Sequence, residues 1–447
     1  MEYTQKIVDF ILNTKYEDLP PKAIDNARGR ILDCIGCGFA GTAEETGRIV
    51  RTYLLDNGGN PQATVLNSGI RTSVTSAAFA NGVLMHAMDY DDNSMPAMAH
   101  TTTCVLPAAL AVSEYAGADG RDLLLAYVIG HEVFNKVAAC LTTECWYKGF
   151  HGTGIFGAYG ACAAAGKLLG LNRDEMTRAL GIAASSFTGL KQNMGSMTKP
   201  YHAGRAAESG VRACLFAKWG FTSKPNAFEG PQGYVHVFST EPRWDHIDEL
   251  GKVWEIVERP PFIKPHPSCG GTHASMNALR FLMKEHPEIS EDTVEQLIVG
   301  ANAGVPGQLL YHDAKDTLEA KFCIEFCLAV MLHYRRWGLS LHTQENVDDP
   351  KIKAIYPKIS VVVDEELSKR LPPEFADLTS ILTVVMKDGT RYQKEADCPD
   401  FSYEEIKEKY WETSALAIDR ETAEKVERII ADLGDHGSLT DLYELMG

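Results

Sequence analysis

The stretch 194–204 places a lysine, a proline and a histidine between two glycines, and its sequence is MGSMTKPYHAG. Lys199 directly precedes Pro200, and a residue in that position is disfavoured in the helical region of backbone space. We therefore predict that Lys199 lies on a bent, defined piece of backbone rather than on an ordinary solvated helix face. If burial or a neighbouring cation lowers its pKa, such a lysine can accept a proton from a substrate.

Two further side chains in this part of the chain, His202 and Arg205, are predicted to bind the substrate. An arginine can hold a carboxylate through two parallel hydrogen bonds, which fixes both its position and its orientation. The alternative for Arg205 is a charge on a helix surface that forms a salt bridge with Glu208.

An acidic stretch, 88–93, has the sequence MDYDDN and is followed by His100. Three interpretations are open. Asp89, Asp91 and Asp92 could bind a divalent cation, because hard cations prefer several oxygen ligands. The acidic residues could instead end a helix and cap a turn. In the third interpretation one of the carboxylates holds a basic group while His100 transfers a proton, a task that suits histidine near neutral pH.

A third stretch, 149–157, has the sequence GFHGTGIFG and formally matches the pattern GxGxxG. The residues before it do not form a core strand and the region is not a βαβ unit, so a dinucleotide-binding fold is rejected. The pattern instead predicts a helix that begins after His151, with free N–H groups that attract a carboxylate. His151 would lie beside that anion, or be a satisfied buried residue among packing glycines. Tyr147, just upstream, is predicted to contact the substrate.

A fourth stretch, 264–273, has the sequence KPHPSCGGTH and lies where the two predicted domains join, a common place for a binding pocket. We predict that Lys264 holds the substrate and that Cys269 contacts it. Two alternatives are weaker: Cys269 as a covalent nucleophile, and a zinc site from His266, Cys269 and His273, for which no fourth ligand is visible.

The composition limits the class of protein and its partners. The chain has 447 residues, of which 45% are hydrophobic and 23% charged, as in a globular protein of two or three domains. The net charge of −17 argues against nucleic acid as a partner, because phosphate binding favours a basic surface. A local basic pocket can still take an anionic small molecule.

The cysteines and the N-terminus point to a compartment. The 11 cysteines have no framework-like spacing, and the CxxC formed by Cys34 and Cys37 lies in an apolar helical pattern. Buried free thiols in a reducing compartment are the best interpretation. The sequence has no signal-peptide pattern and no long uninterrupted apolar run, so we predict a cytoplasmic protein without a membrane partner.

Apolar periodicity divides the chain into two regions. Residues 1–257 are predicted to be almost entirely helical, with many Ala and Gly residues that allow helices to approach closely. The fold class is mainly α with an α+β second domain: a large all-helical domain over 1–257 and 403–447, and a smaller α+β lid domain over 258–402. Within the lid we predict a long helix over 317–337, a hairpin turn at Asp388–Gly389, and strands over 294–303, 358–363, 378–386 and 391–396.

Taken together, these motifs resemble the MmgE/PrpD family, which includes 2-methylcitrate dehydratase, cis-aconitate decarboxylase and iminodisuccinate epimerase. The resemblance implies a helical domain with an α+β lid, an active site between the domains, a homodimer, and neither a metal nor an organic cofactor. The matching segments occur in family order over nearly the whole chain: HAMDYDD (86–92), VLPA (105–108), GFHGTGIFG (149–157), MTKPYHAGRAA (197–207), KPHPSCGGTH (264–273) and LEAKFCIE (318–325).

The resemblance also implies roles for individual residues. The functional positions of the family fall on Asp89, His100, His151, Lys199 and Lys264.

Two residues depart from the pattern of the decarboxylase-like members. Asn93, which we expect to contact the substrate, stands where a threonine is common. Cys269 stands where those members carry a further histidine, and this argues against cis-aconitate decarboxylase activity.

We therefore expect a cofactor-independent lyase that acts on a di- or tricarboxylate, first of all a hydro-lyase of the 2-methylcitrate dehydratase type. Lys199 or His151 would accept a proton, His100 would donate one, and Lys264 would stabilise negative charge beside a carboxylate. An epimerase like iminodisuccinate epimerase and a decarboxylase like cis-aconitate decarboxylase are the enzymatic alternatives. A scaffold that binds a carboxylate without turnover is the non-enzymatic one.

Overall fold

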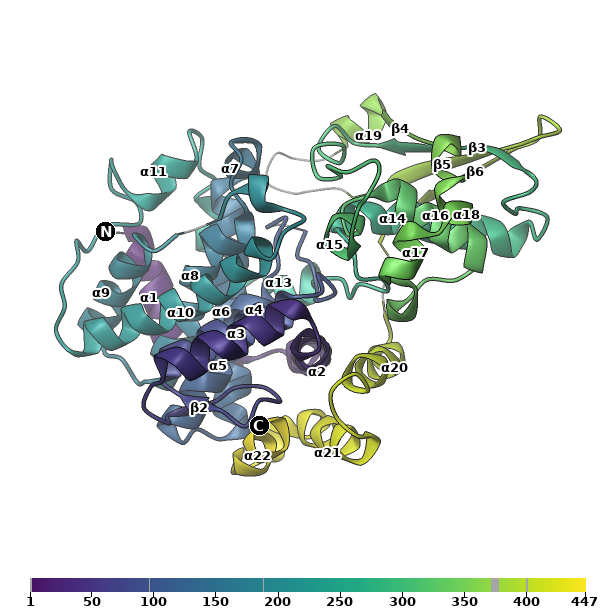
Figure 1. Ribbon diagram of the computed structural model, residues 1–447. Helices are drawn as coiled ribbons and strands as arrows, with labels where there is room; N and C mark the ends of the chain where they lie inside the picture. The colour runs from purple at the N-terminus through teal and green to yellow at the C-terminus, as the bar shows by residue number, and fades with distance from the viewer. Residues whose placement is uncertain (1, 96, 188, 371–377, 399–400) are drawn as a thin grey trace.

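The computed structural model describes residues 2–95, 97–187, 189–370, 378–398 and 401–447, and it has two bodies (Figure 1). The larger body is helical, and the smaller one combines helices with a four-stranded sheet. This confirms the predicted fold class. The predicted boundaries at 257, 258, 402 and 403 stay a prediction.

The helical body consists of long helices joined by short ones, which agrees with the almost entirely helical region predicted over 1–257. Two-residue strands, β1 (Ala63–Thr64) and β2 (Arg71–Thr72), form a small hairpin that the sequence did not indicate. The helices are α1 (Glu2–Asn13), α2 (Pro21–Thr42), α3 (Glu45–Asn57), α4 (Val74–His86), α5 (Thr102–Ala116), α6 (Gly120–Leu141), α7 (Glu144–Tyr147), α8 (Gly152–Leu168), α9 (Arg173–Ala183), α10 (Thr198–Lys218), α11 (Tyr234–Phe238), α12 (Asp245–Asp248) and α13 (Glu255–Glu258).

Small residues bring three of these helices close together. A Cβ atom at Gly82 of α4 would lie 2.9 Å from the Cα of Gly204 in α10. A Cβ at Gly210 of α10 would lie 2.5 Å from the Cβ of Ala161 in α8. Real side chains do not tolerate such distances, so glycine is required for this packing. As a result, the ends of α4, α8 and α10 converge.

The second body carries a mixed sheet in the order β4-β3-β5-β6. Strand β3 (Val294–Ala301) runs parallel to β4 (Ile359–Val363) and antiparallel to β5 (Ser380–Met386), which pairs with β6 (Arg391–Ala396). Gly389, with φ of +88°, lies in the predicted β5–β6 hairpin turn. The other elements are α14 (Gly270–Glu285), α15 (Thr317–Ala320), α16 (Ile324–Tyr334), α17 (Gln344–Asp348), α18 (Pro350–Lys353) and α19 (Glu365–Lys369).

The long helix predicted over 317–337 is wrong. The structure has a short α15 and a separate α16, and the residues between them leave the helical hydrogen-bond ladder. The carbonyl of Lys321 accepts a hydrogen bond from the N–H of Cys269 at 2.7 Å, and the carbonyl of Phe322 accepts one from Tyr311 at 3.3 Å. These bonds to other segments replace continued helix.

The last three helices return to the helical body, as the yellow end of the chain in Figure 1 shows. They are α20 (Tyr403–Ser414), α21 (Arg420–Ala431) and α22 (Thr440–Met446). Helix α20 packs against α2, where Lys409 Nζ lies 2.7 Å from Asp33 Oδ1 in a buried ion pair.

One helix in the described part of the chain, α6, is long and apolar enough to cross a membrane. The whole of its apolar window is buried by the rest of the protein. Core helices of globular proteins have the same length and composition, so α6 is weak evidence for a membrane span.

Candidate active site

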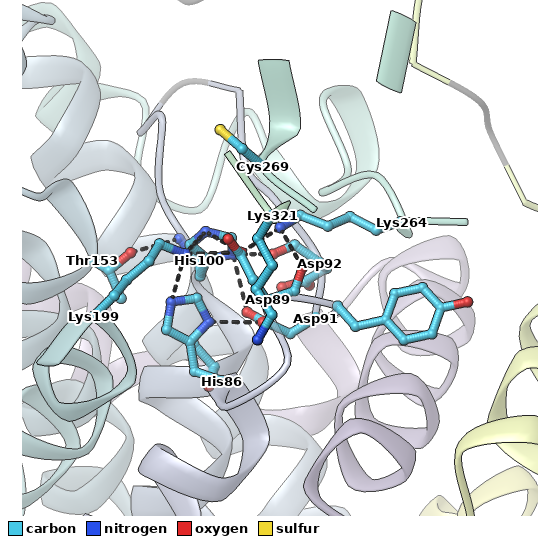
Figure 2. Close-up of polar contacts among 12 residues, drawn as sticks. His86, Asp89, Asp91, Asp92, His100, Thr153, Lys199, Lys264, Cys269 and Lys321 are labelled. Carbon is cyan, nitrogen blue, oxygen red and sulfur yellow. Dashed lines mark hydrogen bonds and ion pairs between the residues drawn. The ribbon is translucent and has the colours of Figure 1, made fainter. Parts of the chain in front are cut away.

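Ionisable side chains from both bodies meet where the ends of α4, α8 and α10 converge (Figure 2). Asp89 follows α4, and His100 lies just before α5. Lys199 lies in the first turn of α10, and Lys264 comes from the segment before α14 in the second body. All four side chains are buried. Lys199 is buried, so it does not lie on a solvated helix face, but the prediction of bent backbone is wrong. The first helical turn needs no N–H from Pro200, so both residues lie in α10.

Asp89 is the anion that joins the two bodies. Its Oδ1 lies 2.8 Å from Lys199 Nζ and 2.6 Å from Lys264 Nζ, and Lys264 also donates to the Asp89 carbonyl at 2.9 Å. Burial alone would raise the pKa of Asp89, but the two lysines outweigh it and hold that pKa well below the usual range. The φ of +53° at Asp89 is uncommon for a residue with a side chain, and it marks a strained turn.

Lys199 lies at the centre of the cluster. A lysine ammonium has three N–H donors. Three acceptors surround this one: Asp89 Oδ1 at 2.8 Å, His86 Nε2 at 3.0 Å and His100 Nε2 at 3.3 Å. Burial lowers the pKa of Lys199 and the nearby Lys264 lowers it further, while Asp89 opposes both effects. The result is an ammonium whose proton is held less tightly than that of an exposed lysine.

Asp91 lies between the two histidines. Its Oδ1 lies 2.7 Å from His86 Nδ1 and its Oδ2 lies 3.0 Å from His100 Nδ1. Asp91 Oδ1 accepts a hydrogen bond from His86 Nδ1, and the main-chain carbonyl of Asp92 accepts one from His100 Nδ1 at 2.9 Å. Both Nδ1 atoms therefore carry the proton, and both Nε2 lone pairs face Lys199. Burial lowers the pKa of His86 to about 3, and burial together with Lys199 lowers the pKa of His100. Both imidazoles are therefore neutral at pH 7 and able to accept a proton.

A second histidine pair borders the first. His151 is the N-cap of α8, which begins after it as predicted, and its Nδ1 lies 3.1 Å from His202 Nδ1. The ring centroids of His151 and His100 are 6.2 Å apart. Burial lowers the pKa of His202 to about 4 and holds that of His151 well below its usual value. The structure therefore brings both predicted histidines to the edge of the cluster.

Asn93 and Cys269 lie where the two bodies touch. The backbone N–H of Asn93 donates to Phe262 O at 3.0 Å, and its buried side-chain Oδ1 has no hydrogen-bond partner among the described residues. Cys269 precedes α14 and contacts Gln308 Oε1 through Sγ at 3.7 Å. Burial raises the pKa of Cys269, so this side chain is a neutral thiol and a poor nucleophile.

Two predicted substrate ligands are not brought to the cluster. Arg205 forms a salt bridge with Glu208 on α10 and lines a different surface cavity of about 350 Å³, beside Tyr53 and Tyr201. The contacts of Arg205 therefore match the alternative interpretation, a helix-surface charge that forms a salt bridge with Glu208. Tyr147 is 67% exposed at the end of α7. For Arg205, α10 turns the side chain away from the face that carries Lys199.

Two sets of side chains bring possible metal ligands together. His86, Asp89, Asp91 and His100 each offer a ligand atom within 4.8 Å of the others. Lys199 Nζ occupies the place that three of these residues share, so they already surround a cation. In the suggested zinc set, both ring nitrogens of His273 face main-chain carbonyls, those of Cys269 and His266, at 3.1 and 3.0 Å. Neither set of residues fits a metal ion well.

Two residues of the cluster, His86 and Lys321, were not among the predicted site residues, and Asp91 was considered only as a possible ligand of a divalent cation. The spacing of His86 and Asp91 in HAMDYDD was a usable signal, because a turn after a helix can fold a carboxylate back onto the last histidine. Lys321 gave no such signal, since it lay within a predicted helix. Its Nζ donates to the carbonyl of Ala87 at 2.9 Å.

Known proteins are similar to this chain over most of their length and most of its own. Cis-aconitate decarboxylase of Mus musculus is 27% identical, covering 99% of this chain and 93% of that protein. The Homo sapiens enzyme is 26% identical, covering 97% and 92%. 2-Methylcitrate dehydratase of Cupriavidus necator is 24% identical, covering 86% and 82%.

Family models match both bodies. The MmgE/PrpD N-terminal domain matches residues 5–247, and the MmgE/PrpD C-terminal domain matches residues 266–435. The chain therefore belongs to the MmgE/PrpD family, as its motifs predicted.

Proposed function

We propose that the protein is a cofactor-independent lyase that acts on a tricarboxylate. The observation that carries this proposal is the Lys199 ammonium, buried against Asp89 and against the Nε2 lone pairs of His86 and His100. This arrangement holds one transferable proton beside two neutral bases. It is what elimination or decarboxylation next to a carboxylate requires. The names of the similar enzymes support the substrate class.

The mechanism follows from these contacts. Bond cleavage leaves negative charge on the carbon next to a substrate carboxylate, and the ammonium groups of Lys199 and Lys264 stabilise that charge in a site closed to water. Lys199 then delivers its proton to the carbon. The neutral amine of Lys199 regains a proton from solvent when the product leaves, and the Nε2 lone pair of His100, 3.3 Å away, accepts an N–H of the restored ammonium. The lowered pKa of Lys199 eases the first transfer.

The similar enzymes change the order of the candidate reactions. The sequence alone favoured dehydration, whereas cis-aconitate decarboxylases match the chain at higher identity and over more of its length than 2-methylcitrate dehydratases do. We therefore place decarboxylation of cis-aconitate first: the carbon–carboxylate bond breaks, CO₂ leaves, and a proton takes its place.

Dehydration of 2-methylcitrate is the second candidate. Cys269 favours it, because a neutral thiol occupies the position of a histidine in decarboxylase-like members. The predicted epimerase, homodimer and cytoplasmic location stay predictions.

Proton NMR in deuterated water tests the proposal. The purified protein is incubated with cis-aconitate, 2-methylcitrate, citrate and iminodisuccinate stereoisomers, in the presence of a chelator. Loss of CO₂ with one deuteron incorporated is expected from cis-aconitate, and new vinyl signals from 2-methylcitrate would select the dehydratase. Deuterium exchange without net elimination would point to an epimerase, and silence across the panel would contradict the proposal. A Lys199→Met variant is the control for contaminating activity.

A further inference from the structure

The cations predicted to bind substrate carboxylates are already paired in this structure. Lys199 and Lys264 both contact the same oxygen of Asp89. Arg205 is paired with Glu208 in a different part of α10. A tricarboxylate carries three negative charges, so recognition of all its carboxylates needs a further cation.

Lys321 is a buried lysine of the second body with spare hydrogen-bonding capacity. Its side chain is 4% exposed, and its Nζ donates to the carbonyl of Ala87 at 2.9 Å. Within the described ranges, no carboxylate lies within 4.0 Å of this ammonium. One of its three N–H donors is therefore used, and two are available. Burial lowers its pKa, against the attraction of Glu44 and Asp89.

The break between α15 and α16 places this lysine. Lys321 follows the last residue of α15, and its carbonyl accepts the N–H of Cys269, at the start of α14, at 2.7 Å. Figure 2 shows the side chains of Lys264 and Lys321 approaching the loop that carries Asp89 and Asp91. Because Ala87 is two residues before Asp89, the ammonium of Lys321 lies beside the turn that carries Asp89 and Asp91.

With Lys321 included, the cluster contains more ammonium groups than fully ionised carboxylates. The lysines at positions 199, 264 and 321 lie near two ionised carboxylates, Asp89 and Asp91, while the histidines around them are neutral. A third carboxyl of the turn, Asp92, has a pKa that burial raises to about 7, so it is only partly ionised at neutral pH. A buried ammonium without an anionic partner is costly, and a bound anion removes that cost.

We propose that Lys321 is a third cation of the active site and binds one carboxylate of the substrate. This inference rests on the proposed tricarboxylate lyase and adds a residue that determines how many carboxylates the site recognises. The carboxylate would accept the free N–H donors of Lys321 while Lys199 and Lys264 face the reacting carbon.

A purely structural role is the competing explanation, and the same turn provides a matched control. Lys409 also donates to a carbonyl of this turn, that of Tyr90 at 2.6 Å, but Asp33 neutralises its charge. A Lys409→Met variant with Asp33→Asn removes a carbonyl contact and leaves the charge excess in place. Lys321→Met removes both the contact and the charge.

Isothermal titration calorimetry with two unreactive ligands tests the role of Lys321. Propane-1,2,3-tricarboxylate has three carboxylates and glutarate has the two outer ones. Wild-type protein should bind the tricarboxylate more tightly than glutarate. Lys321→Met should weaken tricarboxylate binding by about 10- to 100-fold, the usual effect of losing a charged hydrogen bond. Its effect on glutarate should be much smaller, so the ratio of the two dissociation constants falls.

Other outcomes overturn the inference in distinguishable ways. If Lys321→Met weakens both ligands equally, as we expect for the Lys409 control, Lys321 only supports the turn. Lys321→Gln, which keeps an N–H donor for Ala87 without a charge, should lose the same preference. If neither variant folds by thermal unfolding, Lys321 is structural and the inference is wrong. If wild-type protein shows no preference for the tricarboxylate, the proposed function fails too.

Discussion

Two buried lysines, Lys199 and Lys136, have opposite electrostatic surroundings. Lys136 lies in α6 inside the helical body, with its Nζ 2.8 Å from both Glu249 and Glu255 and 4.0 Å from Glu132. Burial alone would lower the pKa of Lys136, but Glu132 and Glu255 outweigh it and raise that pKa. For Lys199 the shift has the opposite direction, because complete burial, aided by the neighbouring Lys264, outweighs the attraction of Asp89.

The opposite pKa shifts of Lys136 and Lys199 distinguish a charge cluster that stabilises the fold from one that can transfer a proton. Arg259 also pairs with Glu255, at 2.6 Å, so the cations of the Lys136 cluster are matched by carboxylates and nothing needs to be added. The Lys199 cluster instead has an excess of ammonium groups and two neutral imidazoles. Burial of charge is common to both clusters, so burial alone does not identify function. The direction of the lysine pKa shift and the charge balance do.

The largest effect is expected from Lys199→Met, which removes the central ammonium. Turnover should fall by about 10²–10⁴, the range for loss of a general acid or base. The folded structure should persist, because Asp89 keeps its contact with Lys264. Steady-state kinetics and circular dichroism measure the two properties. Turnover near the wild-type value in a folded variant would remove Lys199 from the mechanism.

Lys136→Met should produce the reverse pattern. Removal of one partner from a buried ion pair costs about 3–5 kcal/mol of unfolding free energy, since the remaining carboxylates are left buried without compensation. Urea denaturation measures this loss, and kcat per folded molecule should stay at the wild-type value. A drop in kcat without a change in stability would show that the two clusters are not functionally distinct.

A pH-dependent effect is expected from Glu132→Gln. Burial raises the pKa of Glu132 from its ordinary value of 4.5 to about 8, so the folded state favours the protonated carboxyl. Its contribution to stability is therefore fully present below pH 4.5 and is lost as the pH rises to 8. The variant should gain at least about 1.4 kcal/mol relative to wild type between pH 5 and pH 8.5, which corresponds to one pKa unit. Urea denaturation of both proteins at both pH values measures this gain. If the difference in unfolding free energy between variant and wild type is the same at both pH values, the raised pKa of Glu132 is contradicted.

The smallest effect is expected from Arg205→Gln. Its salt bridge with Glu208 is partly exposed, and such pairs contribute about 0–1 kcal/mol to stability. The KM for a tricarboxylate should stay within about threefold of the wild-type value, because Arg205 lies outside the cluster. A tenfold or larger rise in KM would restore the original prediction that Arg205 binds a carboxylate.

Much of the architecture was predictable from local patterns. The helices of the first region, the four strands of the second and the turn at Gly389 follow from periodicity and turn chemistry, which depend on neighbouring residues. The approximate site was also predictable, since Asp89, His100, His151, Lys199 and Lys264 stand in recognisable motifs. The helix break at Lys321 was not, because hydrogen bonds to Cys269 and Tyr311 override the local helical pattern.

The sequence by itself therefore determined the family, the classes of secondary structure and most of the ionisable residues at the site. The tertiary structure decided which of them touch: the three acceptors around Lys199, the carboxylate that lies between two histidines, and the direction of Arg205. The physical reason is that these contacts join residues about 100 or more positions apart in several cases, and they exist because glycines let α4, α8 and α10 approach closely. Sequence spacing sets the face of a helix, but only packing sets what that face meets.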